Sequence, residues 1–161
     1  MSECGQVDQP DGRPGPDLSH VRTMWDADEA SRALGIEILR LGVDDSIPTP
    51  LGHARTRMPV VQQMVNGHDI AHGGYIFALA DSTFALACNA TGQLTVAAGA
   101  DITYISPGRL GDVLVADARE RVRFGRSGLA DVTVTREADG AVIAEFRGRS
   151  RTLPARQEPP R

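Results

Sequence analysis

Aromatic residues are scarce in this chain of 161 residues: they make up 4% of it, while hydrophobic residues as a whole make up 41%. A chain of this length fits one domain with a sizeable core, and that core must be built from Val, Leu, Ile and Ala. Cysteine is rarer still, because Cys4 and Cys88 are the only two. Their wide separation gives neither metal-ligand spacing nor a disulfide framework, so the sequence favours a reduced, cytoplasmic protein.

An excess of positive charge is also missing, since 17 basic residues stand against 21 acidic ones and the net charge is −4. This balance argues against nucleic acid as a partner. The longest apolar stretch, Tyr75 to Cys88, is interrupted by polar residues and is shorter than the roughly 18 to 20 residues of a membrane span. Near the start of the sequence no basic segment precedes an apolar one, so no secretory signal is expected.

Gly, Pro and Asp are frequent in residues 1–20, which show almost no apolar periodicity. We interpret this segment as a disordered tail, and residues 154–161 in the same way. Residues 21–153 are then expected to form a single domain. Apolar residues at helical spacing predict a first helix over residues 23–34.

A sheet and one buried helix are predicted for the rest of the domain. The predicted strands span residues 36–43, 51–58, 96–105, 112–122, 129–136 and 142–151. Hairpin signals at Gly125 to Gly128 and at Asp139-Gly140 suggest that the last four strands form an antiparallel meander. Residues 74–90 are apolar on every side of a helical wheel, which predicts a buried helix. A curved antiparallel sheet wrapped around this helix, an α+β architecture, is the economical arrangement.

The segment from Asn66 to Gly74 leads directly into the buried helix and is a candidate binding site. The first amide groups of a helix have no internal partners, and Gly73 and Gly74 allow another molecule to approach them closely. The helix dipole adds partial positive charge, so an anion or a carbonyl oxygen that gains negative charge can be stabilised there. A plain tight turn is the alternative. His72 is interpreted as a structural hydrogen-bond partner or as a base that titrates near neutral pH.

Asp81 is the one charged residue within the apolar helix, where an unpaired carboxylate is unfavourable. Either a hydrogen bond to Ser82, Thr83 or the backbone compensates, or Asp81 is a catalytic carboxylate in a site of restricted water. Gly73 and Asp81 are eight residues apart, about 12 Å along a helix axis, so one carbonyl does not easily touch both in one subunit. Two such helices packed side by side in opposite directions bring them together. If both residues act, the active site is shared across a homodimer.

Arginines lie near the predicted turns and on the last strand: Arg109, Arg123, Arg126, Arg147, Arg149 and Arg151. Most surface arginines are merely solvated, but an anionic substrate such as coenzyme A has phosphates that they can bind. His68 and His72 lack the helical pattern needed for a shared metal-binding face, so no metal site is expected. A phosphate-binding loop of the Walker type and a serine-centred nucleophile elbow are both absent from the sequence.

Several segments together carry a family resemblance: His72-Gly73-Gly74, Leu79-Ala80-Asp81, Ala87-Cys88-Asn89, Ile102 to Gly108, Gly111-Asp112, Gly125 to Gly128 and Phe146 to Ser150. Over approximately residues 24–152 the sequence resembles the hotdog-fold acyl-CoA thioesterases of the phenylacetic acid degradation type. The resemblance implies a hotdog fold and hydrolysis of an acyl-CoA, with phenylacetyl or hydroxyphenylacetyl groups typical of this branch. It also implies a homotetramer built as a dimer of dimers, with no cofactor beyond the coenzyme A of the substrate.

The resemblance assigns roles to residues at the helix. It implies that Asp81 activates water or attacks directly, that the backbone N–H of Gly73 polarises the carbonyl, that Asn66 positions water and that His72 supports the helix start. Candidates for contact with coenzyme A are Gly74, Arg109, Arg123, Arg126 and Ser127. Some relatives carry Ser or Thr on the strand that faces the carboxylate, whereas this chain has Val-Ala-Ala-Gly at residues 96–99. Which hydroxyl assists Asp81 is therefore open.

Two other functions stay open at this point. One is a hydratase or dehydratase of the same fold, which needs a His paired with a carboxylate, here His72 and Asp81 across a dimer. The other is a non-catalytic acyl-CoA-binding module, such as a ligand-sensing regulator. Regulators of that kind normally carry an added DNA-binding segment, which the acidic N-terminal tail does not resemble.

Overall fold

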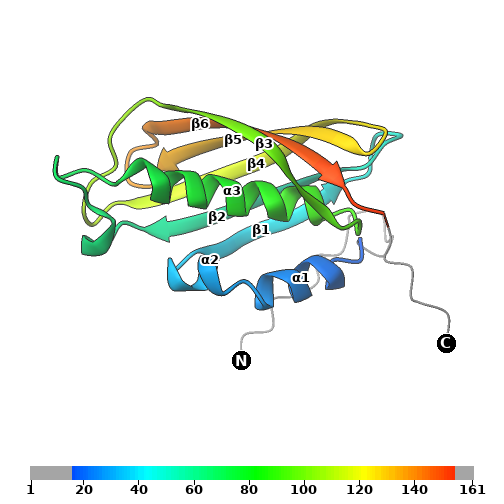
Figure 1. Ribbon diagram of the computed structural model, residues 1–161, viewed down its shortest axis with the longest axis horizontal. Helices are drawn as coiled ribbons and strands as arrows, with labels where there is room; N and C mark the ends of the chain where they lie inside the picture. Colours follow the sequence, from blue (N-terminus) through cyan, green and yellow to red (C-terminus); the bar gives the residue numbers. More distant parts are fainter. Residues whose placement is uncertain (1–15, 155–161) are drawn as a thin grey trace.

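The computed structural model describes residues 16–154 as one antiparallel sheet with a long helix against it (Figure 1). The elements in chain order are α1 (Ser19–Asp26), α2 (Glu29–Ala33), β1 (Glu37–Asp44), β2 (Leu51–Pro59), the 3-10 helix η1 (Gln62–Met64), α3 (Gly73–Asn89), β3 (Thr95–Tyr104), β4 (Val113–Phe124), β5 (Ser127–Arg136) and β6 (Val142–Thr152). The predicted curved sheet around a central helix is confirmed. Most of both predicted tails lies outside the described residues, and α1 begins two residues inside the first.

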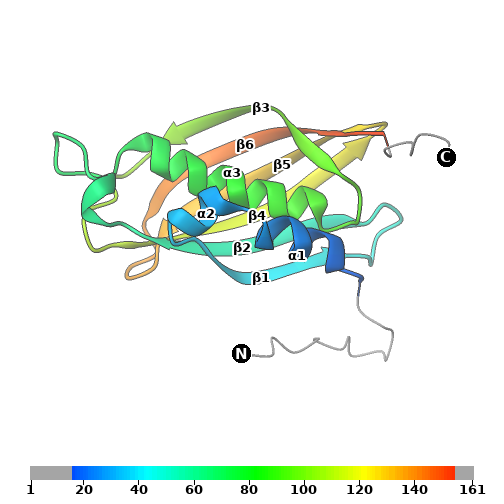
Figure 2. The same cartoon turned by 60° about the horizontal axis from the view of Figure 1, so that its bottom comes forward.

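The order of strands in the sheet corrects one part of the prediction. The six strands follow the order β1-β2-β4-β5-β6-β3, and every neighbouring pair is antiparallel. Strands β4, β5 and β6 form the expected meander. Strand β3 was expected beside β4 as the first strand of this meander. It pairs instead with β6, at the edge of the sheet. Figure 2 shows β3 running beside α3 along the length of the helix.

The first predicted helix is two helices. Asp28 separates them, because its Oδ1 accepts the N–H of Ser31 at 3.0 Å and thereby caps α2. Asp is favoured at the N-cap position of a helix, where the backbone is not yet helical and the side chain accepts one of the free N–H groups of the first turn. Two of the apolar residues at helical spacing in this segment, Met24 and Leu34, pack against the core. Both helices contact α3 and lie on the same side of the sheet as α3 (Figure 2).

The sheet presents small side chains to α3, which lets the helix sit close to it. Inward-facing positions of the central strands include Ala54, Ala118 and Ala130, all fully buried. At Gly148 a Cβ atom would lie 2.4 Å from the ring of Phe84, so only glycine leaves room for that aromatic side chain. Close packing of this kind excludes voids and fixes the position of the helix on the sheet.

Candidate active site

The start of α3 is shaped by its N-cap residue, His72. The Nδ1 atom of His72 accepts the N–H of Gly74 at 3.1 Å, and its carbonyl oxygen accepts the N–H of Tyr75 at 3.0 Å. Within residues 16–154, the N–H of Gly73 donates to no acceptor. The helix therefore presents one free amide at its N-terminal end, where the helix dipole adds partial positive charge.

Asn66 lies in the tight loop that leads into α3. Its backbone N–H donates to the carbonyl of Ile70 at 2.9 Å, and its side-chain Oδ1 accepts the N–H of His68 at 2.9 Å. This turn fixes the orientation of the Asn66 side chain. In the described part of the chain, the Nδ2 group of Asn66 has no acceptor. The structure thus brings Asn66, His72 and Gly73 to one end of the molecule.

Asp81 projects from the middle of α3 as a half-buried carboxylate. The two neighbouring hydroxyls that might have satisfied it are used elsewhere: Ser82 Oγ lies 2.8 Å from Ser31 Oγ, and Thr83 Oγ1 lies 2.7 Å from Thr56 Oγ1. Among residues 16–154 the Asp81 carboxylate has no hydrogen-bond or ion-pair partner. Burial alone raises the pKa of the Asp81 carboxyl above its ordinary value.

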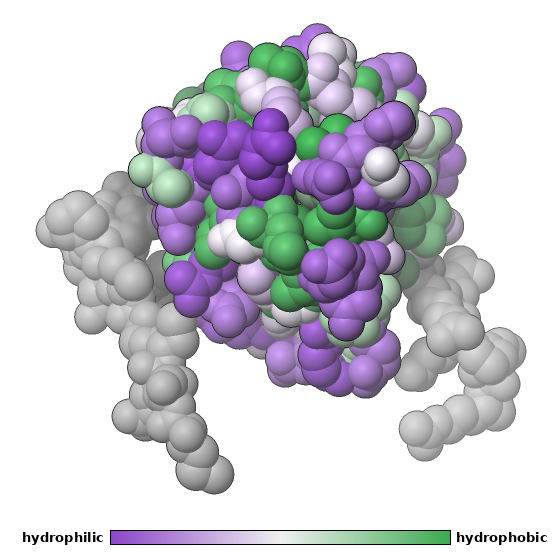
Figure 3. All heavy atoms as spheres, turned by 90° about the vertical axis from the view of Figure 1, so that its left-hand side faces the viewer, coloured by the Kyte–Doolittle hydropathy of each residue, from purple (hydrophilic) through white to green (hydrophobic). Residues whose placement is uncertain are grey.

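Apolar side chains are exposed in the loops at the end of the molecule where α3 begins. Val61 is 40% exposed, Ile105 55% and Leu110 53%. The view of this end in Figure 3 shows apolar surface enclosed by hydrophilic residues. Tyr104, the last residue of β3, is half-exposed and donates a hydrogen bond from its hydroxyl to the carbonyl oxygen of Gly73 at 2.8 Å. No local pattern in the sequence predicts this contact, although Tyr104 is one of only two tyrosines in an aromatic-poor chain.

The residues expected to contact coenzyme A fall into two groups at opposite ends of α3. Gly74 and Arg109 lie at the N-terminal end, where the guanidinium of Arg109 is exposed. Arg123, Arg126 and Ser127 lie on the β4–β5 hairpin at the C-terminal end. A helix of 17 residues separates the two groups by about 25 Å. Within one chain they do not form a single binding site.

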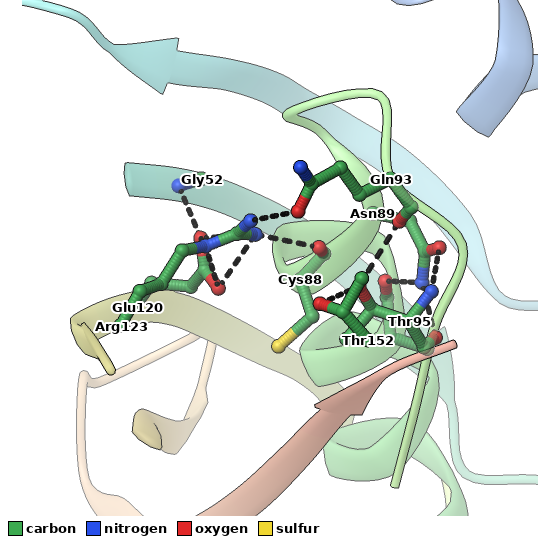
Figure 4. Close-up of polar contacts among 9 residues, drawn as sticks. Gly52, Cys88, Asn89, Gln93, Thr95, Glu120, Arg123 and Thr152 are labelled. Carbon is green, nitrogen blue, oxygen red and sulfur yellow. Dashed lines mark hydrogen bonds and ion pairs between the residues drawn. The ribbon is translucent and has the colours of Figure 1, made fainter. Parts of the chain in front are cut away.

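Arg123 is held inside the fold. Its guanidinium forms an ion pair with Glu120 at 2.9 Å, and its Nη2 also donates to the carbonyl of Cys88 at 2.8 Å (Figure 4). Glu120 also accepts the backbone N–H of Gly52 at 2.7 Å. The side chains of Glu120 and Arg123 are 1% and 16% exposed, and the pKa of Glu120 is raised by burial. Contact between Arg123 and a ligand would compete with these bonds.

Asn89 fastens the same end of α3 to the start of β3. Its Nδ2 group donates to the carbonyls of Ala85 at 2.9 Å and Thr95 at 2.8 Å. In return, its Oδ1 accepts the N–H of Thr95 at 2.9 Å (Figure 4). The buried Asn89 side chain thereby replaces the helix and sheet bonds that the backbone lacks at this turn.

Some other chemistries find no support in residues 16–154. In this range no group of three or more His, Cys, Asp or Glu side chains is placed to hold a metal ion. Burial raises the pKa of the Cys88 thiol to about 12, so it is protonated and a poor nucleophile. No helix there is long and apolar enough to cross a membrane.

Residues 68–143 match the family model described as the thioesterase superfamily. The chain is similar to acyl-coenzyme A thioesterase PaaI of Escherichia coli K12, with 37% identity over 134 residues that cover 83% of this chain and 89% of that protein. It is also similar to human acyl-coenzyme A thioesterase 13, with 33% identity over 98 residues, which cover 60% and 70% of the two chains.

Solved structures share the arrangement of sheet and helix. The structure of the E. coli PaaI protein from the phenylacetic acid degradation operon superposes with a TM-score of 0.75 at 35% identity, covering 86% of this chain and 97% of that one. A hypothetical thioesterase of Streptococcus pneumoniae TIGR4, solved with coenzyme A, gives a TM-score of 0.66 at 25% identity, covering 76% and 88%. The hotdog fold expected from the sequence is confirmed.

Proposed function

The chain belongs to the thioesterase superfamily, and we propose that it hydrolyses acyl-coenzyme A thioesters to a free acid and coenzyme A. The two named relatives above are acyl-coenzyme A thioesterases, and one structural relative was solved with coenzyme A. Because the E. coli relative comes from a phenylacetic acid degradation operon, phenylacetyl-CoA or hydroxyphenylacetyl-CoA is the proposed substrate type.

The observation that carries the mechanism is the carboxylate of Asp81, which lies in an otherwise apolar helix and has no partner among residues 16–154. In the proposed reaction, Asp81 removes a proton from the attacking water or attacks the thioester carbonyl itself. The free N–H of Gly73 donates to the carbonyl oxygen as it gains negative charge, and one such donor lowers the barrier by around 3 kcal/mol. The Nδ2 group of Asn66 orients the water, and His72 holds the helix start. A thiolate leaves readily, so no strong general acid is required.

We place this site between two copies of the chain. The face of α3 turned away from the sheet carries Ala78, Asp81 and Ala85, none of them fully buried. These small neighbours allow a second helix to approach Asp81 closely. At the sheet edge, β3 has a strand neighbour on one side only within the part of the chain that the structure describes, and we propose that a second copy pairs with the other side. An antiparallel pair of α3 helices would bring the C-terminal group of coenzyme A candidates to the N-terminal group of the partner.

The family resemblance extends this proposal to a dimer of dimers, and the scarcity of cysteine favours a location in the cytoplasm. Of the coenzyme A candidates, Arg109, Arg126 and Ser127 are the ones whose side chains are proposed to reach the phosphates, with Gly74 allowing close approach. Arg123 would support the hairpin that carries Arg126 and Ser127, since its own guanidinium is engaged.

Thiol release from a panel of acyl-CoA substrates tests the function. Purified protein is expected to release free coenzyme A from arylacetyl-CoA esters faster than from short straight-chain esters, as followed with a thiol reagent. The same protein is expected not to hydrate an enoyl-CoA, measured by loss of its ultraviolet absorbance. Hydration without thiol release would replace the hydrolase by a hydratase, and tight binding without either reaction would point to a non-catalytic module.

Mixed dimers test whether the site is shared. Asp81→Asn removes the carboxylate. Gly73→Pro removes the amide proton at the first position of α3, where a helix accepts proline, and also displaces the ring of Tyr104 that lies against residue 73. Each variant alone is expected to be nearly inactive. When the two are co-expressed with different affinity tags, mixed dimers contain one site with both wild-type groups, so about a quarter of all sites regain activity if pairing is random. Activity no higher than that of the separate variants would place both groups of a site in one chain.

A further inference from the structure

The peptide unit between Gly73 and Gly74 is held at both of its polar groups. Its N–H, that of Gly74, donates to Nδ1 of His72 at 3.1 Å. Its carbonyl, that of Gly73, accepts the hydroxyl of Tyr104 at 2.8 Å. The two side chains come from different elements, since His72 caps α3 and Tyr104 ends β3. Without such bonds, a peptide flanked by two glycines has wide freedom in its backbone dihedrals.

The preceding peptide unit, between His72 and Gly73, is held by a hydrogen bond at its carbonyl but not at its N–H. The carbonyl of His72 accepts the N–H of Tyr75 at 3.0 Å, while the N–H of Gly73 has no acceptor within residues 16–154. The direction of that free N–H therefore depends on the dihedrals of Gly73. Those dihedrals are set by the peptide units on either side of it, and one of these is the unit that Tyr104 holds.

The ring of Tyr104 also lies directly against Gly73. A Cβ atom at residue 73 would be 2.8 Å from Cζ and 2.9 Å from the hydroxyl oxygen of Tyr104. Any larger residue at this position would displace the ring of Tyr104 from its contact with residue 73. Partial burial raises the pKa of the phenol above its ordinary value, so the hydroxyl is protonated and able to donate at neutral pH.

We propose that Tyr104 is a positioning residue for the thioesterase reaction: it holds the Gly73–Gly74 peptide from the strand side and so aims the free N–H of Gly73 at the reacting carbonyl. This inference rests on the proposed function of Gly73 as the donor to that oxygen. An electrostatic donor is effective only when its geometry is set before charge develops, and a small misplacement lowers the rate steeply. Tyr104 itself touches no reacting atom in this scheme.

Tyr104→Phe removes the hydroxyl and keeps the ring. Loss of the neutral hydrogen bond between the Tyr104 hydroxyl and the Gly73 carbonyl is expected to lower kcat about 3- to 10-fold. KM should change less than about 2-fold, because ground-state binding does not use the free N–H strongly. In parallel, the protein labelled with 15N-glycine reports the backbone by NMR. Faster solvent exchange of the Gly74 amide and altered shifts of Gly73 and Gly74 are expected in the variant.

Tyr75→Phe is the matched control, since it removes the hydroxyl of the only other tyrosine in the sequence. It is expected to leave the exchange of the Gly74 amide unchanged. If Tyr104→Phe also leaves that exchange unchanged, or speeds it while kcat stays at the wild-type value, Tyr104 is not a positioning residue. Wild-type protein that releases no thiol from any acyl-CoA overturns the proposed function instead, and the amide signals still decide whether Tyr104 holds the peptide.

Discussion

Replacing Asp81 with Asn is expected to lower kcat for thioester hydrolysis by about 10²- to 10⁴-fold, the range that a positioned acid–base group contributes. The amide keeps the size and much of the polarity of the carboxylate but neither accepts a proton from water nor attacks a carbonyl. Binding of coenzyme A should stay near the wild-type level, because the residues proposed to contact the nucleotide lie elsewhere. Single-turnover thiol release with saturating substrate measures the chemical step directly.

The same variant is expected to be at least as stable as the wild type at neutral pH. Burial raises the pKa of Asp81 in the folded protein, so the folded state holds the proton more tightly than the unfolded state does. Stability of the wild type therefore falls as pH rises from the ordinary carboxyl pKa through the raised one. Asn carries no such penalty, and the difference between the two proteins should disappear below that window. Thermal unfolding at several pH values measures it.

A structural role for Asp81 makes the opposite prediction. If Asp81→Asn lowered the melting temperature at neutral pH and activity fell only in proportion to the unfolded fraction, Asp81 would be a stabilising residue. Ser82→Ala serves as the neighbouring control, because Ser82 faces Ser31 rather than Asp81. It is expected to retain most of the wild-type kcat.

Arg123→Met is expected to lower the free energy of unfolding by about 3 to 5 kcal/mol, since it leaves the Glu120 carboxylate buried without its cation. It also removes the donor to the carbonyl of Cys88 at the end of α3. The pKa of Glu120, already raised by burial, should rise further in the variant. The loss of stability should therefore shrink as pH falls and Glu120 takes up a proton. Urea unfolding at pH 7 and pH 5 provides the comparison.

Two further variants distinguish this mechanism from a general effect of losing an arginine. Arg147→Met removes a shorter ion pair with Asp131, but those side chains are 59% and 32% exposed, so a change of about 0 to 1 kcal/mol is expected. Adding Glu120→Gln to Arg123→Met should restore part of the stability, because the uncompensated charge is gone while an acceptor for Gly52 remains. Equal losses for Arg123→Met and Arg147→Met would contradict the burial argument.

Local patterns in the sequence predicted most of the fold because each strand and the central helix carry their own periodicity. The predicted helix over residues 74–90 and the structure's Gly73–Asn89 differ by one residue at each end. The predicted position of β3 beside β4 was wrong. The chain crosses the sheet between these two strands, and hairpin signals predict only the pairing of strands that a short turn connects. The split at Asp28 was visible only as a capping residue inside an otherwise helical pattern.

In the candidate site, too, the residues with local sequence signals were predicted and those that depend on distant contacts were not. The sequence indicated Asp81 and Gly73 because a charge in an apolar helix and a glycine pair before it are local features. It missed Tyr104 and Glu120, whose importance depends on contacts 31 and 68 residues away along the chain. Arg123 was grouped with the arginines that were expected to bind coenzyme A, because a hairpin sequence does not distinguish a buried arginine from an exposed one.

The two ends of β3 are fastened to the two ends of α3, through Asn89 and Thr95 at one end and Gly73 and Tyr104 at the other. A strand and a helix tied at both ends must keep matching lengths. An insertion or deletion of one residue in β3, beyond the irregularity that its pairing with β6 already has between Ala97 and Gly99, would turn the rest of the strand over and detach one of the two anchors. Changes of length are therefore expected to be tolerated in the turns rather than in β3.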